Sequence, residues 1–164
     1  MLRKLEPRDA VRMHEWMHDE DVIKGLQAHL FRTKTLDDCL RFVHLSQQDD
    51  TNFHRAIVDE QGTYQGTISL KNINHEFQDA EFAIVLHSDA QGKGYAKQSM
   101  KEIMEIAFGE LNLNEVYWNV LESNTRAISL YEKSGAVKEE KPSERLKASA
   151  PNGKKVIFYK VVKK

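Results

Sequence analysis

The six residues Gln-Gly-Lys-Gly-Tyr-Ala have the composition of a loop that holds an anion. They lie between an apolar stretch, Ala80–Leu86, and a helical pattern that runs to Phe108. The first amides of a helix lack internal partners and carry partial positive charge, so they bind phosphate groups. Two glycines let the main chain approach the anion, and a lysine adds charge. We therefore predict a phosphate or pyrophosphate site at Gln91, Gly92, Lys93, Gly94, Tyr95 and Ala96.

The two commonest nucleotide-binding loops do not fit these residues. A P-loop needs Ser or Thr after its lysine and Gly five residues before its second glycine, but Gly94 and His87 occupy those positions. A dinucleotide fingerprint needs a third glycine where this chain has Lys97. The pattern that remains is Q-x-x-G-x-A. The loop alone leaves open a glycine-rich turn that binds nothing.

A second motif lies about 30 residues further on, in the expected helix Thr125–Ser134. Asn124, Ala127 and Tyr131 follow a spacing of three and then four residues, which places them on one helix face. An amide and a phenol flank a small residue there, so the face has room and two polar groups. The alternative is an ordinary half-buried helix in which Asn124 is the N-cap.

Together, in this order and spacing, the two motifs resemble those of the GNAT superfamily of acetyl-CoA-dependent N-acetyltransferases. The resemblance is strongest over Ala80–Gly135. It is nearest to the branch of ribosomal-protein N-terminal, spermidine and amino-sugar-nucleotide acetyltransferases. One departure is Ala136, where the family usually has an aromatic residue, and this change removes a packing contact but no chemical group.

The resemblance implies a fold, a cosubstrate and several roles. The fold is α/β, with a mixed, mostly antiparallel central sheet flanked by helices. The cosubstrate is acetyl-CoA, bound at the two motifs. Its pantetheine arm is expected to lie along the main chain of Ile84, Val85 and Leu86, where an N–H group could polarise the thioester carbonyl. The phenol of Tyr131 is expected near the thiol sulfur.

Acetyl transfer to a primary amine needs a proton transfer at the attacking amine and another at the leaving thiolate. An alkyl amine has a pKa of about 10.4 and must lose a proton before it attacks, while a thiolate leaving group has a conjugate acid of pKa about 8.5. Glu81 is the candidate base, because it is the one charge in an apolar strand that leads to the phosphate loop. Burial would raise the pKa of such a carboxyl group; an ion pair at the solvent edge is the alternative. Tyr131 is the candidate acid.

The acceptor is not specified by either motif. In the branch it resembles, the acceptor site is built by the first helices and nearby loops. Acidic residues there would suit a polyamine, aromatic and basic residues would suit an amino-sugar nucleotide, and a solvated helix end is the alternative for the acids. A small-molecule amine is favoured over a protein N-terminus. The residues concerned are Trp16, Asp19, Glu20, Asp21, His29, Phe31 and Arg32.

Three other interpretations compete with this one. His14-Glu15-Trp16-Met17-His18 fits the zinc-protease pattern H-E-x-x-H, but Asp21 and Lys24 replace the glycine and third histidine of the extended form. No metal is therefore expected. Cys39 is more readily a small core residue than a nucleophile. A non-catalytic acyl-CoA-binding module on the same fold would explain the motifs but not the presence of both Glu81 and Tyr131.

The hydrophobic periodicity predicts the helices and strands that position these residues. A helix is expected from about Pro7, and another over Leu36–Ser46 with Leu36, Leu40 and Val43 on its buried face. Antiparallel strands come first, and a strand–helix–strand–helix–strand series follows. The expected strands are Phe53–Val58, Thr63–Leu70, Ala80–Leu86, Glu115–Leu121 and Val156–Val162.

Length and composition bound the rest. The chain has 164 residues, 40% of them hydrophobic and 30% charged, which suits one globular domain over residues 1–164. The net charge of −1 and the lack of a dense basic run argue against nucleic acid as a partner. No apolar stretch approaches the roughly 18 residues of a membrane span. One cysteine and no secretory segment suggest the cytoplasm. A homodimer is the commonest assembly, although no residue selects it.

Overall fold

One seven-stranded sheet runs through the protein, in the order β1-β2-β3-β4-β5-β7-β6. The computed structural model describes residues 1–164. Every neighbouring pair is antiparallel except β4 with β5, which is parallel, so the expected mixed and mostly antiparallel sheet is confirmed. The strands are β1 (Leu2–Arg3), β2 (Phe53–Val58), β3 (Tyr64–Asn74), β4 (Asp79–Leu86), β5 (Glu115–Leu121), β6 (Val137–Lys138) and β7 (Val156–Val162).

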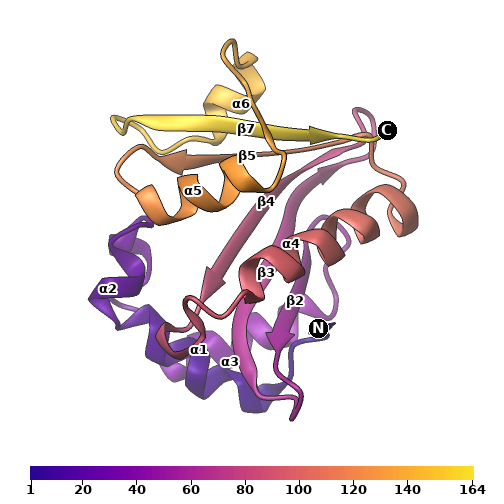
Figure 1. Cartoon of the computed structure of the whole chain (residues 1–164). Helices are drawn as coiled ribbons and strands as arrows, with labels where there is room; N and C mark the ends of the chain where they lie inside the picture. Colours follow the sequence, from indigo (N-terminus) through magenta and orange to yellow (C-terminus); the bar gives the residue numbers. More distant parts are fainter.

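Helices cover both faces of this sheet (Figure 1). On one face α4 and α5 pack on a core that includes Phe82, Ile103 and Trp118, while on the other α1 and α3 pack on a smaller core around Met13 and Tyr64. None of the helices is long and apolar enough to cross a membrane. The α-helices are α1 (Ala10–Met17), α2 (Glu20–Ile23), α3 (Leu36–Ser46), α4 (Tyr95–Glu105), α5 (Thr125–Lys133) and α6 (Glu144–Ser149).

Shorter helical turns join these elements. They are three 3₁₀ turns, η1 (Pro7–Asp9), η2 (Ala28–Leu30) and η3 (Ser88–Ala90), and a π-helical turn, η4 (Ile106–Glu110). The turn η4 continues α4, so the helix expected to reach Phe108 changes its hydrogen-bonding pattern after Glu105.

Strands β4 and β5 separate along their length, and this separation positions the site. They pair only from Asp79–Glu81 to Glu115–Tyr117. Beyond these residues the strands diverge, and Figure 1 shows the gap between them widening toward α2. The diverging half of β4 therefore has a main-chain edge with no neighbouring strand, which is open to a ligand.

The expected strands and helices agree with the structure in type, and two of them differ from it in extent or orientation. The strand β3 extends to Asn74, beyond the expected end at Leu70. The face of α3 was predicted correctly at Val43, which is buried, and wrongly at Leu36 and Leu40, which remain exposed; Cys39 is buried in their place. Apolar spacing fits both faces of this helix, and the packing against α1 selects the one that carries Cys39.

Candidate active site

The loop between β4 and α4 has the geometry of an anion site. Gly92 and Gly94 have φ angles of 73° and 85°, in the left-handed region that favours glycine. A Cβ atom at either position would meet no atom within 4 Å, so the space in front of the loop is open. The amides from Gly92 to Ala96 donate to no acceptor within the chain. Free amides, open space and the positive end of an 11-residue helix all fit a pyrophosphate group.

The second motif lies beside this loop. Asn124 caps α5, its Oδ1 accepting from the amide of Ala127 at 3.3 Å, and its Nδ2 donates to the carbonyl oxygen of Gly25 at 3.2 Å. Arg126 donates to the side-chain oxygen of Gln91 at 3.0 Å. The start of α5 is thereby joined to the phosphate loop. The structure thus brings together the two motifs that the sequence places about 30 residues apart.

Tyr131 lies on the inner face of α5, within an aromatic cluster. Its ring centroid is 5.1 Å from Trp118, 5.4 Å from Tyr159 and 6.4 Å from Phe82. Only 6% of the residue is exposed, and burial raises the pKa of the phenol well above its usual value, with Tyr159 adding to the shift. The phenol is therefore protonated at neutral pH, as it would be at its usual pKa, and its hydroxyl is available as a hydrogen-bond donor.

The open edge of β4 presents alternate residues to the gap. The amide of His87 donates to Gln65 on β3 at 2.8 Å, so by antiparallel alternation the main chain of Val85 also faces β3. The main-chain groups of Ile84 and Leu86 then face the gap. The side chain of Gln91 confirms this direction, because it donates to the carbonyl oxygen of Leu86 at 3.2 Å.

Glu81 lies where β4 and β5 are still paired, on the other face of the sheet from Tyr131. Its neighbour Phe82 packs toward Tyr131, and successive strand residues point to opposite faces. The carboxylate is 3.6 Å from the ammonium of Lys71, and the side-chain amide of Asn72 donates to it at 3.5 Å. The structure thus places Glu81 in an ion pair and does not bring it to Tyr131.

The H-E-x-x-H residues do not assemble a metal site. Nδ1 of His87 accepts from the main-chain amide of Asp89, so Nε2 carries the proton and donates to the Glu15 carboxylate at 3.1 Å. No three His, Cys, Asp or Glu side chains lie together as metal ligands do. Cys39 is 1% exposed, and burial raises the pKa of its thiol, so it is an inert core residue.

The residues expected at the acceptor site divide into three groups. Trp16 belongs to the core and donates to the hydroxyl of Tyr64 at 3.0 Å, and the partly buried Phe31 packs edge-on against it. His29 and Arg32 line a cavity of about 1010 Å³.

The acids of that segment have partners within it. Glu20 is bonded to Arg32 at 2.8 Å, Asp21 lies 3.7 Å from Lys24, and Asp19 caps α2. The acidic cluster is therefore largely neutralised by its own neighbours.

Several residues of this region were not found from the sequence. Lys154 and Lys155 line the same cavity, although as a pair they indicate nothing specific. Pro151-Asn152-Gly153 could have marked the turn that carries them, but not what this turn faces. Gly25 was missed as well. A Cβ atom there would lie 2.8 Å from Nδ2 of Asn124, so only glycine permits this close approach.

The comparisons with known proteins agree with this geometry. Residues 1–137 match the family described as acetyltransferase (GNAT) domain. The spermidine N(1)-acetyltransferase of Escherichia coli K12 is 32% identical over 139 residues, covering 82% of this chain and 70% of that protein. A putative ribosomal N-acetyltransferase of Bacillus subtilis is 26% identical, covering 99% of this chain and 91% of the relative.

Among solved structures, a spermidine N-acetyltransferase from Vibrio cholerae in complex with CoA and spermine superposes with a TM-score of 0.81. The identity is 25%, and the alignment covers 99% of this chain and 94% of the other. The fold and site define an acyltransferase, and the chain belongs to the GNAT acetyltransferase family. It is an N-acetyltransferase that uses acetyl-CoA as its cosubstrate.

Proposed function

We propose that this enzyme transfers acetyl to the primary amine of a small molecule by direct attack, with residues 1–164 acting as one catalytic domain. The observation that carries the proposal is the gap between β4 and β5, which opens beside both cofactor motifs and a large cavity. Relatives named for spermidine favour a small amine over a protein N-terminus. Both a polyamine and an amino-sugar nucleotide are small molecules with a primary amine, so either could be the acceptor in this proposal.

The donor side of the proposal uses the cofactor motifs. The free amides from Gly92 to Ala96, with the side chain of Lys93, hold the pyrophosphate. The main-chain groups of Ile84 and the amide of Leu86 face the gap and pair with the pantetheine arm. The carbonyl oxygen of Leu86 is held by Gln91, and the main chain of Val85 pairs with β3. The second motif, Asn124 and Ala127, borders the same channel.

The transfer itself needs no covalent enzyme intermediate. The amine nitrogen forms a bond to the thioester carbon, the carbon–sulfur bond breaks, and the leaving thiolate takes the proton of the Tyr131 phenol. The acylated nitrogen then loses its second proton, which restores the Tyr131 phenol. The ammonium proton of the acceptor passes to Glu81, through an ordered water because this carboxylate lies on the opposite face of the sheet. The acceptor would then approach from the face of α1 and α3, and the thioester from the face of α4 and α5.

The test is an acceptor screen that follows release of free CoA thiol. Polyamines, amino-sugar nucleotides, amino-sugar phosphates and ribosomal-protein peptides are each offered with acetyl-CoA. We expect turnover with at least one small amine and its mono-acetylated product by mass spectrometry. Tight CoA binding without turnover across the panel would instead show a binding module, and turnover confined to peptides would show a protein substrate.

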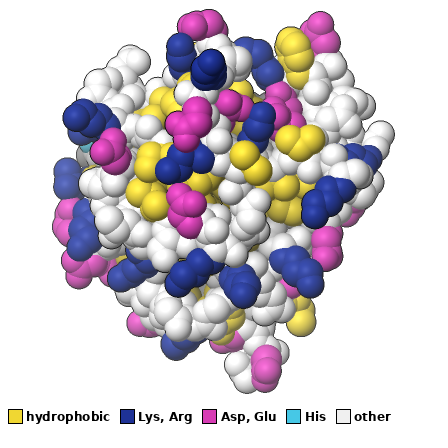
Figure 2. Space-filling model, turned by 45° about the horizontal axis from the view of Figure 1, so that its top comes forward, with side chains coloured by type: hydrophobic (Ala, Val, Ile, Leu, Met, Phe, Trp, Pro, Cys, Tyr) yellow, Lys and Arg dark blue, Asp and Glu magenta, His cyan; other side chains and the backbone are white.

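Compartment and assembly complete the proposal. The single cysteine, Cys39, is free and buried, which is compatible with the cytoplasm. Small-molecule acetylation there requires neither a membrane nor nucleic acid as a partner. Figure 2 shows basic and acidic side chains interspersed on the face that it presents, rather than a field of one sign. A homodimer is the proposed assembly, and light scattering across a concentration series would test it.

A further inference from the structure

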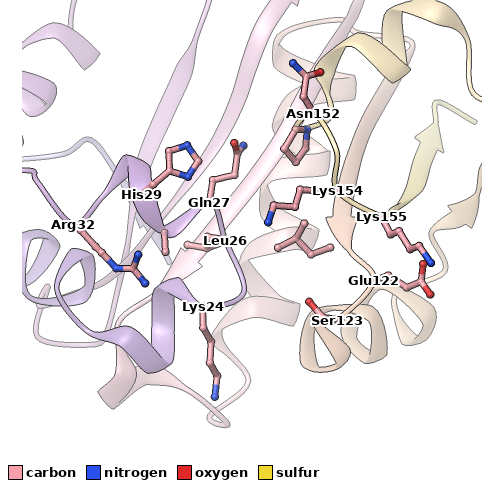
Figure 3. A pocket seen from close by; sticks show the side chains of 13 residues that line it. Lys24, Leu26, Gln27, His29, Arg32, Glu122, Ser123, Asn152, Lys154 and Lys155 are labelled. Carbon is pink, nitrogen blue, oxygen red and sulfur yellow. The ribbon is translucent and has the colours of Figure 1, made fainter.

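The large cavity of about 1010 Å³ lies between two segments that are distant in the sequence. One wall is the α2–η2 segment, and the other combines the end of β5 with the turn that precedes β7 (Figure 3). Only three of the cavity's thirteen lining residues are hydrophobic. The volume is at the upper end of the range of about 300–1,000 Å³ for small-molecule sites, so it has room for a ring-bearing ligand.

The charged groups around this cavity are mostly cationic. Its lining includes a single carboxylate, Glu122, and four cationic side chains, which are Lys24, Arg32, Lys154 and Lys155. Two of the four have carboxylate partners, Glu20 for Arg32 and Asp21 for Lys24. The ion pairs of the chain include neither Lys154 nor Lys155. With Glu20, Asp21 and Glu122 set against the four cations, the cavity has an excess of one positive charge.

The cationic groups come from both walls. Figure 3 shows the side chain of Lys154 extending from the β7 side toward the wall that carries His29 and Arg32. Groups of like sign that face one cavity raise its positive potential, which attracts anions and repels polycations. A polyamine would bring its own positive charge into this field, whereas a phosphate would offset it.

The cavity lies next to the second cofactor motif. Ser123 lines it, and the next residue, Asn124, caps α5 and is bonded to the α2–η2 wall at Gly25. Leu121 also lines it, and the preceding Val120 packs in the same core as Tyr131. A ligand held here is thus next to the widening gap in the sheet. This position suits the acceptor.

We infer that the acceptor is a primary amine that also carries a negatively charged group of the phosphate type, held by Lys154 opposite Arg32 and His29. The inference rests on the proposed function and narrows its acceptor. The anionic group binds in the cavity, and the amine extends into the gap between β4 and β5. A sugar phosphate and a nucleoside diphosphate sugar supply the same chemistry.

The test compares amines that differ in charge. Glucosamine, glucosamine 6-phosphate, an amino-sugar nucleotide and spermidine are assayed with the wild type, Lys154→Glu and the matched control Lys141→Glu, an exposed lysine outside the cavity. We expect a phosphorylated amine to be preferred. Lys154→Glu should lower its kcat/KM by about tenfold or more, on the scale of one charge-assisted hydrogen bond. The control and the KM for acetyl-CoA should not change.

Direct binding separates this inference from the proposed function. Calorimetry with glucosamine 6-phosphate and CoA present should show binding that Lys154→Glu abolishes and high salt weakens. If no amine is turned over but this binding holds, the function fails and the anion site stands. Spermidine as the preferred acceptor, loss of CoA binding in Lys154→Glu, or an acidic peptide as the preferred substrate would each overturn the inference.

Discussion

The cofactor loop and the acceptor cavity are neighbours that are built in opposite ways. The loop is a run of consecutive residues that offers main-chain amides held by two glycines. The cavity is lined by long side chains from three segments, residues 24–32, 121–123 and 151–155. Main-chain groups cannot be changed by most substitutions, whereas side chains can. Most substitutions would therefore leave the anion-binding groups of the loop in place, whereas a single substitution can change the charge of the cavity.

The largest expected effect tests the chemistry that the two sites share. Tyr131→Phe should lower kcat by about a hundredfold or more, the usual contribution of a general acid. The affinity for CoA should remain close to that of the wild type, because the ring and its aromatic neighbours are retained. Steady-state kinetics and CoA titration measure the two effects. An unchanged kcat would remove Tyr131 from the acid role.

The next effect breaks the donor site alone. Gly94→Val should weaken acetyl-CoA binding by on the order of tenfold to hundredfold, because a branched residue is strained at a φ of 85° and its side chain would enter the space before the amides. Gly135→Val is the matched control, since Gly135 is exposed, has a φ of 84° and also has open space around it. Equal losses in the two variants would argue against a pyrophosphate at this loop.

A smaller effect concerns the base on the acceptor side. Glu81→Gln should lower kcat/KM for the acceptor by about tenfold at neutral pH. The difference in kcat/KM should shrink as the pH approaches the pKa of the acceptor amine, because the amine then loses its proton to solvent without a base. Lys71→Met, which removes only the ion-pair partner, is the control. A deficit that is constant with pH would indicate a structural role for Glu81.

The smallest effect lies outside both sites. Burial lowers the pKa of His54 to about 4, although Asp49 opposes the shift. Between pH of about 6.5 and 4 the unfolded chain binds a proton that the folded chain does not, so the free energy of unfolding falls as the pH falls. His54→Gln should flatten this slope without changing either substrate's KM. Urea unfolding at pH 7 and 5 measures it, and an unaltered slope would contradict the assignment.

The elements that carry the proposed donor site could be predicted from the sequence because they are local. A helix start, two glycines and an amide–alanine–phenol face are all set by residues within one or two turns of each other. The strands β2, β5 and β7 begin and end at the expected residues, since their apolar runs end at charged or turn residues. Position along one element is enough for each of these predictions.

The acceptor side could not be predicted because it depends on contacts between distant segments. Helix α6 was missed although Ser143 caps it, since six residues show little periodicity. What holds this helix to β4 is the paired hydrogen bonds of Arg145 to Asp79, which are 66 positions apart. Lys154 has no local feature that distinguishes it from other exposed lysines. The proposed role of Lys154 in anion binding follows only from its position opposite His29 and Arg32.

The hydrogen bond from Asn124 to Gly25 has a consequence for how the two substrates bind. It joins residues 99 positions apart, one on the cofactor helix and one on the loop of the acceptor wall. A cofactor that fixes Asn124 also orders this loop. The acceptor then binds to a loop that is already ordered, so its binding carries no further entropy cost for the loop. By thermodynamic reciprocity, each substrate then raises the affinity for the other by the same factor. The enzyme would therefore favour the ternary complex over either binary one.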